Sequence, residues 1–200
     1  YPKIFNDADK GNEAKKLYQD AQTMLEQIIN EKWLTANATF GIFEANRIAD
    51  DTVELTDHIL KLEFLRNQEE KSEDVPNLSL ADFIAPKESG KTDFIGAFVV
   101  TAGIGIEDHI KRFEADHDDY SAIMLKVLAD RLAEAFAELL HLKVRTNYWG
   151  YAKNENLELS GILREKYRGI RPAPGYPACP EHSEKRKLFD LLNVEESIGV

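Results

Sequence analysis

The chain has 200 residues, of which 43% are hydrophobic, and a formal net charge of −11 at pH 7. This length suits one domain with a substantial core, and no stretch approaches the roughly 20 apolar residues that span a bilayer. The negative charge argues against a nucleic-acid surface and against anionic membranes. The single cysteine excludes an intramolecular disulfide and a cysteine-built metal site, and it suits a cytoplasmic location.

The first part of the chain predicts a helix followed by a β-hairpin. Apolar residues recur at three- and four-residue spacing over residues 12–31, with charged residues on the opposite side. This pattern predicts an amphipathic helix packed against a sheet. Residues 38–45 and 52–63 carry runs of β-branched and aromatic residues on either side of a polar turn at residues 46–51, so we expect them to pair as a hairpin.

The middle of the chain completes an α+β pattern. The charged residues 67–74 are interpreted as a solvated loop or a short irregular link, and the nearly all-apolar residues 94–100 as a central strand buried on both faces. The sequence pattern predicts a short helix over residues 107–115 and the longest helix of the chain over residues 121–147. The fold class expected is therefore α+β, with a twisted antiparallel or mixed sheet packed by residues 12–31 and 121–147.

The longest predicted helix has two different faces. At 100° per residue, Asp130, Glu134 and His141 fall within about 40° of one another, opposite the apolar stripe. An ordinary charged surface and a second face that lines a cleft both remain open as interpretations. The apolar stripe, interpreted as core, comprises Leu125, Leu128, Leu132, Ala135, Phe136, Leu139 and Leu142.

An aromatic cluster, YWGY at residues 148–151, follows that helix. Core packing and an aromatic wall for a flat ligand such as adenine are both possible. No Ser-His-Asp or Cys-His arrangement suggests independent catalysis, so no catalytic residue is predicted. The five histidines also lack the spacing of zinc ligands, so no metal site is predicted.

The sequence RPAPGYPACPEH at residues 171–182, here called the proline-rich segment, holds four of the seven prolines. Because proline fixes φ and removes an N–H donor, this segment predicts a stiff, pre-ordered loop with carbonyl groups in surplus. Arg171 supplies a fork of donors suited to a carboxylate or phosphate, and Gly175 permits a close backbone approach. A plain surface loop and a polyproline ligand remain alternatives.

These residues resemble the signature of the activation domain of cobalamin-dependent methionine synthase, which is an S-adenosylmethionine-binding module. The resemblance extends along nearly the whole chain and implies a single domain over residues 1–200. It is carried by the proline-rich segment together with REKYRGI (164–170), GIFEANR (41–47), LADFIAPK (80–87), DFIGAF (93–98), HDDY (117–120), LADRLAEAF (128–136) and YWGY (148–151).

The resemblance implies a function in which S-adenosylmethionine is the methyl donor for reductive methylation of cob(II)alamin during methionine biosynthesis. Arg171 would bind the ligand's carboxylate, and Glu134 and Glu165 would balance its positive charges. Backbone groups of the proline-rich segment would contact the adenosine or amino-acid portion. The ligand-binding residues implied are Arg171, Glu134, Glu165, Pro172, Ala173, Gly175 and Tyr176.

The resemblance also implies partners. The cobalamin would be held by a neighbouring domain of the same enzyme, a methyltransferase. Tyr176 would face the cobalt, and Asp130 with Glu107 would hold the histidine released from it, since an imidazolium donates charge-assisted hydrogen bonds to carboxylates. A flavodoxin or flavin reductase would supply the electron, so the chain would provide binding and orientation rather than the nucleophile.

Two parts of the family pattern are missing from the sequence. An acidic residue expected before Tyr1 and a sheet segment expected beyond Val200 are both absent. We therefore expect a truncated fold that binds S-adenosylmethionine weakly or not at all by itself and is inactive alone. The alternative hypothesis is a docking module for the reductase and the cobalamin domain that holds no ligand.

Overall fold

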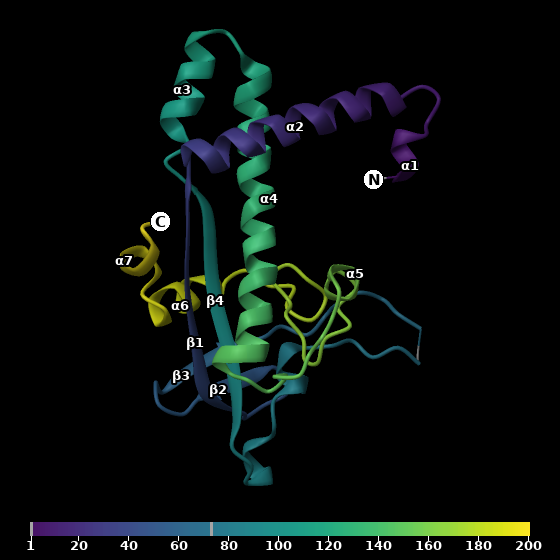
Figure 1. The fold of residues 1–200 in the computed structure, drawn as a ribbon. Coiled ribbons are helices and arrows are strands. Elements are labelled where there is room, and N and C mark those ends of the chain that lie inside the picture. Colours follow the sequence, from purple (N-terminus) through teal and green to yellow (C-terminus); the bar gives the residue numbers. More distant parts are fainter. Residues whose placement is uncertain (1, 73) are drawn as a thin grey trace. The chain divides into compact units, whose positions relative to one another are not determined.

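The computed structural model describes residues 2–72 and 74–200 (Figure 1). It combines helices with a four-stranded sheet, which confirms the α+β class. The helices are α1 (Pro2–Phe5), α2 (Gly11–Glu31), α3 (Glu107–Ala115), α4 (Asp119–Lys143), α5 (Leu159–Ile162), α6 (Lys185–Leu191) and α7 (Val194–Ile198). Short turns are η1 (Leu80–Phe83), η2 (Lys87–Ser89) and the π-helical η3 (Val144–Tyr148). The strands are β1 (Thr35–Arg47), β2 (Thr52–Leu55), β3 (Leu60–Glu63) and β4 (Asp93–Ile104).

The sheet has the order β3-β2-β1-β4. Strands β1 and β2 pair antiparallel with Ala45 opposite Leu55, which confirms the hairpin. The region predicted as one strand over residues 52–63 is two antiparallel strands instead. A polar turn separates them, and Ile59 adopts a left-handed backbone with φ 49° there.

The prediction of a central strand at residues 94–100 is wrong in its position, because β4 is the edge strand. Its beginning also alternates in burial, with Phe94 40% exposed and Ile95 9% exposed. The two faces of this part of the strand are therefore covered unequally. An apolar run alone does not distinguish this case from a strand covered on both faces.

The chain forms two compact units, each with a core of its own. The first unit comprises residues 1–37 and 100–138, and the second comprises residues 38–99 and 139–200. In the first unit, Met24 of α2 packs in one cluster with Met124 and Leu125 of α4. A helix thus covers the buried face of α2, where the sequence analysis expected a sheet.

The core of the second unit lies on the sheet. Val53, Leu55 and Leu62 are at most 1% exposed and pack with Cys179, next to Leu188 of α6. A second cluster joins α7 to the sheet residues Ala97 and Val99 through Val194 and Ile198. The C-terminal helices α6 and α7 therefore fix the chain that follows the proline-rich segment to the sheet.

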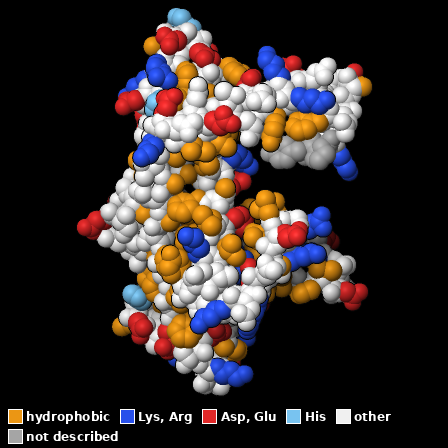
Figure 2. Space-filling view, viewed as in Figure 1, with side chains coloured by type: hydrophobic (Ala, Val, Ile, Leu, Met, Phe, Trp, Pro, Cys, Tyr) orange, Lys and Arg blue, Asp and Glu red, His pale blue; other side chains and the backbone are white. Residues whose placement is uncertain are grey.

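Hydrophobic side chains also remain at the surface, interspersed with charged ones (Figure 2). Leu139, predicted as core, is 47% exposed, whereas Leu125 of the same stripe is fully buried. On the face of α4 opposite its apolar stripe, Ile123 and Val127 are 61% and 51% exposed. Within the described ranges, no helix has the length and apolarity to cross a membrane.

Candidate functional site

The proline-rich segment folds as a hydrogen-bonded turn in the second unit. The amide of Gly175 donates to the Cys179 carbonyl at 2.8 Å, and the Cys179 amide donates to the Tyr176 carbonyl at 2.8 Å. A third bond, at 3.0 Å, joins the Tyr176 amide to the Ala173 carbonyl. Gly175 has φ 104°, a backbone conformation that glycine adopts without strain. The prediction of an ordered, non-helical loop is confirmed.

The predicted ligand-binding residues of this loop differ in exposure. Arg171 and Pro172 are half-buried, whereas Ala173 and Gly175 are exposed, and Tyr176 is 60% exposed. The turn therefore holds one guanidinium against the protein and presents an aromatic ring and a backbone edge to solvent. Such an arrangement can bind an anion beside a flat ring.

Glu165 stands six residues before Arg171 and is exposed. Its φ of 53° is unusual for a residue with a side chain. A strained backbone at a surface acidic residue is consistent with a functional position, because such strain persists only where the surroundings impose it.

A cavity of about 380 Å³ lies beside the proline-rich segment. Its far wall comes from residues 67–69, for which the sequence analysis expected either a solvated loop or a short irregular link. Asn67 is only 3% exposed, so the solvated interpretation is wrong for this residue. The Asn67 side chain donates to the Pro177 carbonyl at 3.1 Å and accepts from the Glu69 amide at 2.8 Å. Nothing in the sequence pattern distinguishes this asparagine. The cavity is lined by Asn67, Gln68, Glu69, Gly175, Tyr176, Pro177 and Pro180.

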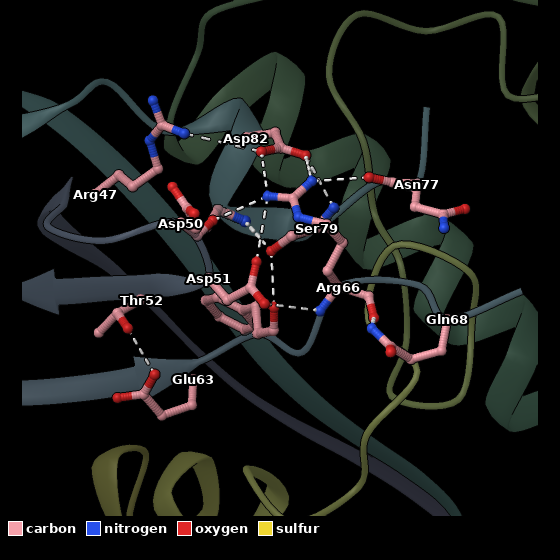
Figure 3. Close-up of polar contacts among 12 residues, drawn as sticks. Arg47, Asp50, Asp51, Thr52, Glu63, Arg66, Gln68, Asn77, Ser79 and Asp82 are labelled. Atoms are coloured by element: carbon pink, nitrogen blue, oxygen red, sulfur yellow. Dashed lines mark hydrogen bonds and ion pairs between the residues drawn. The ribbon is translucent and has the colours of Figure 1, made fainter. Parts of the chain in front are cut away.

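An arginine holds the loop that carries Asn67 (Figure 3). The guanidinium of Arg66 forms two hydrogen bonds to the Asp82 carboxylate, at 2.6 and 2.8 Å, and a further ion pair of 3.2 Å to Asp51. It also donates to the Asn77 carbonyl at 2.8 Å. The hydrogen bond from Arg66 lowers the pKa of Asp82 below its usual value. This wall of the cavity is therefore fixed by charge-assisted bonds.

A buried charged network lies at the C-terminal end of α4 and was not predicted. The guanidinium of Arg145 binds both carboxylate oxygens of Glu155, at 3.1 and 2.5 Å, and its Nη1 lies 2.7 Å from Nδ1 of His141. Burial, followed by the charges of Arg145 and Arg171, lowers the pKa of His141 to about 3. His141 is thus neutral at pH 7 and accepts a hydrogen bond through Nδ1.

This network corrects the interpretation of the second face of α4. His141 is 6% exposed, whereas Asp130 and Glu134 are exposed. The angular spacing of the three residues was right, but it did not predict that burial changes along the helix. The histidine therefore belongs to an interior network rather than to a continuous charged line.

The three predicted acidic residues outside the loop lie in the first unit. Glu134 pairs with Arg131 at 3.0 Å, Asp130 is exposed, and Glu107 is the first residue of α3. The first turn of a helix favours a carboxylate, so the position of Glu107 has an ordinary structural explanation. Across the part of the chain that the structure describes, no group of three or more acidic, histidine or cysteine side chains could hold a metal ion.

The aromatic cluster after α4 packs within the second unit. Trp149 lies edge-on to Tyr151, with ring centroids 5.2 Å apart, and to Phe94 at 6.5 Å. A side chain at Gly96 would meet the Trp149 ring at 3.2 Å. The tryptophan therefore covers the beginning of β4, in agreement with the packing interpretation, while Tyr148 is 57% exposed.

The fold and the loop together define an α+β module that presents a pre-ordered, proline-rich turn at its surface. Over residues 1–200 the chain matches the family described as vitamin B12 dependent methionine synthase, activation domain, and it belongs to that family. It is also similar to the crystal structure of the MetH reactivation domain bound to AdoHcy. The two share 51% sequence identity with a TM-score of 0.90, and the match covers 100% of this chain but 62% of the other.

Proposed function

We propose that the chain binds S-adenosylmethionine at the proline-rich segment and serves the reactivation of a cobalamin-dependent methionine synthase, a methyltransferase of methionine biosynthesis. The proposal depends most on the turn at residues 171–176, which joins a half-buried arginine to an exposed aromatic ring. Membership of the activation-domain family and the similarity to a domain bound to AdoHcy support it.

The residues have separate roles in this proposal. Arg171 binds the ligand's α-carboxylate, because its planar fork of donors matches two carboxylate oxygens. Glu165 and Glu134 balance the ammonium and sulfonium charges. Backbone groups of Pro172, Ala173 and Gly175 receive the adenosine or amino-acid portion, and their loop loses little conformational entropy on binding, because it is already ordered.

The chain would act together with other parts of the enzyme. S-adenosylmethionine supplies an activated methyl group to a cobalamin that a neighbouring domain holds, and a flavodoxin or flavin reductase supplies the electron. On this chain, Tyr176 faces the cobalt side of the cofactor, and its exposed ring fits that role. Asp130 and Glu107 hold the displaced histidine of the cobalamin domain as carboxylate acceptors. The chain contributes binding and orientation.

Calorimetric titration tests ligand binding directly. S-adenosylmethionine and S-adenosylhomocysteine are titrated into the 200-residue chain and into the variants Arg171→Ala and Arg164→Ala. The loss of one charged hydrogen bond costs about 1.5–3 kcal/mol, so Arg171→Ala should weaken binding by roughly ten- to a hundred-fold. Arg164, an exposed arginine of the preceding segment, is the matched control and should have no effect.

Because we expect the 200-residue chain to bind S-adenosylmethionine weakly, the experiment also uses a second, extended form of the protein. A version extended with the residues of the matched domain that have no counterpart here should bind more tightly than the 200-residue chain, and through the same arginine. Equal binding by Arg171→Ala and the unmodified chain would contradict the assignment of Arg171. No binding by either form, at millimolar ligand, would contradict the proposed function.

Docking without a ligand is the second candidate function. It is favoured by the exposed apolar residues Ile123 and Val127, which flank the region of Asp130 on α4. A docking surface of this kind predicts that Asp130→Asn weakens association with the cobalamin domain, whereas Arg171→Ala leaves it unchanged. Because the first candidate also places Asp130 against the cobalamin domain, the calorimetric titration separates the two candidates: only a ligand-binding module loses ligand affinity in Arg171→Ala.

A further inference from the structure

Arg145 is the largest fully buried side chain among the described residues, with an exposed fraction of 0%. It lies in the π-helical turn η3, directly after α4. A charge in the interior requires partners, and the Glu155 carboxylate, 8% exposed, provides one. Buried ion pairs are nevertheless often replaced by apolar residues without loss of stability. Stability alone therefore does not explain why the buried Arg145–Glu155 ion pair is present.

The geometry of the network fixes the plane of the guanidinium. Two bonds to Glu155 and one to His141 hold it from two sides. Because arginine only donates, Nδ1 of His141 is the acceptor and its proton resides on Nε2. A bidentate fork restricts both the position and the orientation of the group.

The ring of Tyr167 packs against the fixed guanidinium plane of Arg145. The Arg145 guanidinium carbon lies 4.1 Å from the Tyr167 ring centroid, and the His141 ring meets the same ring edge-on, at 4.8 Å and 86°. Tyr167 is 8% exposed. The cation and the imidazole therefore enclose one aromatic ring, whose position depends on both.

Tyr167 stands four residues before Arg171 and begins the chain that leads into the proline-rich segment. Gly169, between them, has φ 92°, and a side chain there would meet the Tyr151 hydroxyl at 3.1 Å. The path from Tyr167 to Arg171 is thus closely confined. The charge of Arg171 also contributes to the lowered pKa of His141, so Arg171 and this network interact electrostatically.

We propose that Arg145 is a positioning residue for the ligand-binding turn: it holds Tyr167 through its guanidinium plane, and Tyr167 sets the position of Arg171. Arg145 itself does not touch the ligand. The effect on ligand affinity rests on the proposed function, whereas the effect on the turn does not. Arg145→Lys keeps the charge but removes the fork and the flat face, so it isolates the geometric role.

Hydrogen exchange tests the positioning without any ligand. The readout is the exchange of the Gly175, Tyr176 and Cys179 amides, which form the bonds of the turn. In Arg145→Lys these amides should exchange at least about tenfold faster, because the turn opens locally at lower free energy. Val194→Ala, a core truncation in α7 of the same unit whose cluster does not include Cys179, is the control for general loosening and should leave their rates relative to other amides unchanged.

Ligand binding tests the consequence. With S-adenosylhomocysteine as the probe, Arg145→Lys should weaken affinity by about tenfold or more, since small misplacements of a binding group have effects of this size. Tyr167→Phe keeps the ring and should bind more tightly than Tyr167→Leu, which removes it. Arg145→Lys should add no further loss in a Tyr167→Leu background.

Each outcome distinguishes the two proposals. Unchanged exchange of the turn amides in Arg145→Lys, or an equal change in Val194→Ala, overturns the positioning role whatever the ligand does. Additive losses in the double variant overturn the route through Tyr167. Faster exchange together with no ligand binding by either the 200-residue chain or the extended form supports the positioning role and contradicts the proposed function instead.

Discussion

At the scale of single residues, Arg66 connects three parts of the second unit. Its guanidinium binds Asp82, Asp51 and the Asn77 carbonyl, and Asn67, which borders the cavity, follows it in the chain. Arg66→Ala should lower the free energy of unfolding by about 1.5–3 kcal/mol, the usual cost of lost hydrogen bonds to a charged group. Urea unfolding measures it, with the exposed Arg164→Ala as control; equal midpoints for both variants would contradict a structural role.

His141 makes stability depend on pH. Its pKa is about 3 in the folded protein and near 6.5 in the unfolded chain, so the unfolded chain binds more protons between these values. Stability is fully present above about pH 6.5 and is lost as the pH falls below it. Between pH 7.5 and 5.5 the loss should be about 1 kcal/mol.

Urea midpoints at the two pH values measure this dependence. His141→Asn removes the titrating group and keeps an acceptor oxygen, so its stability should change less over this range. His117→Asn is the matched control, because His117 is exposed and has a φ of 58° that asparagine tolerates. A pH dependence that persists in His141→Asn would assign the proton uptake to another group.

At the scale of elements, the proline-rich turn requires glycine at one point. A side chain at Gly175 would meet the His182 ring at 3.0 Å, with φ 104°. Gly175→Ala should therefore lower the free energy of unfolding by about 1–3 kcal/mol, the cost of backbone strain and a close contact. Thermal unfolding measures it.

Gly90 is the matched control for that substitution. It also has a positive φ, of 66°, but a side chain there would meet nothing within 4 Å. Gly90→Ala should cost about 1 kcal/mol, from the left-handed backbone alone. Adding His182→Ala to Gly175→Ala should recover part of the loss. Equal costs at both glycines would show that the His182 contact does not matter.

The sequence predicted elements whose pattern is local. The helix at residues 12–31 and the hairpin before β3 follow from periodicity, and the stiff loop at residues 171–182 follows from proline, which acts through its own φ. The packing partner of α2 and the edge position of β4 were predicted wrongly. Both depend on residues distant in sequence, which a short window does not contain.

The candidate site divides in the same way. Arg171 and Gly175 could be predicted as candidates because their residue types suit an anion and a tight backbone turn. Asn67 and Arg145 were missed, because an isolated asparagine or arginine is usually exposed, and only the tertiary structure brings them to Pro177 and Tyr167. The residues that touch a ligand can be sought in a motif, whereas those that support them come from elsewhere in the chain.

At the scale of the whole molecule, each unit contains one of the two tryptophans. Trp33 lies in the core of the first unit, and Trp149 packs in the second. Leu125→Ala, at a fully buried position of the first core, should destabilise that unit by about 2–5 kcal/mol. Its effect should appear first in the Trp33 fluorescence.

Single-tryptophan versions separate the two signals. In a Trp149→Phe background, where Trp33 is the probe, Leu125→Ala should shift the urea unfolding midpoint to lower concentration. In a Trp33→Phe background, where Trp149 is the probe, the same substitution should shift the midpoint less. Leu62→Ala, in the core of the second unit, should give the opposite pattern. Coincident shifts of both signals in every variant would mean that the molecule unfolds as one cooperative body.

The chain's only cysteine, Cys179, lies at the base of the proline-rich turn and is 6% exposed. Its backbone forms hydrogen bonds with the backbone of Gly175 and Tyr176. Burial, and then the charge of Glu184, raises the pKa of its thiol. Because the thiolate is the reactive form, an alkylating reagent must wait until the turn opens. The rate at which Cys179 is alkylated therefore reports how often the turn opens. A ligand that holds the turn closed should lower that rate.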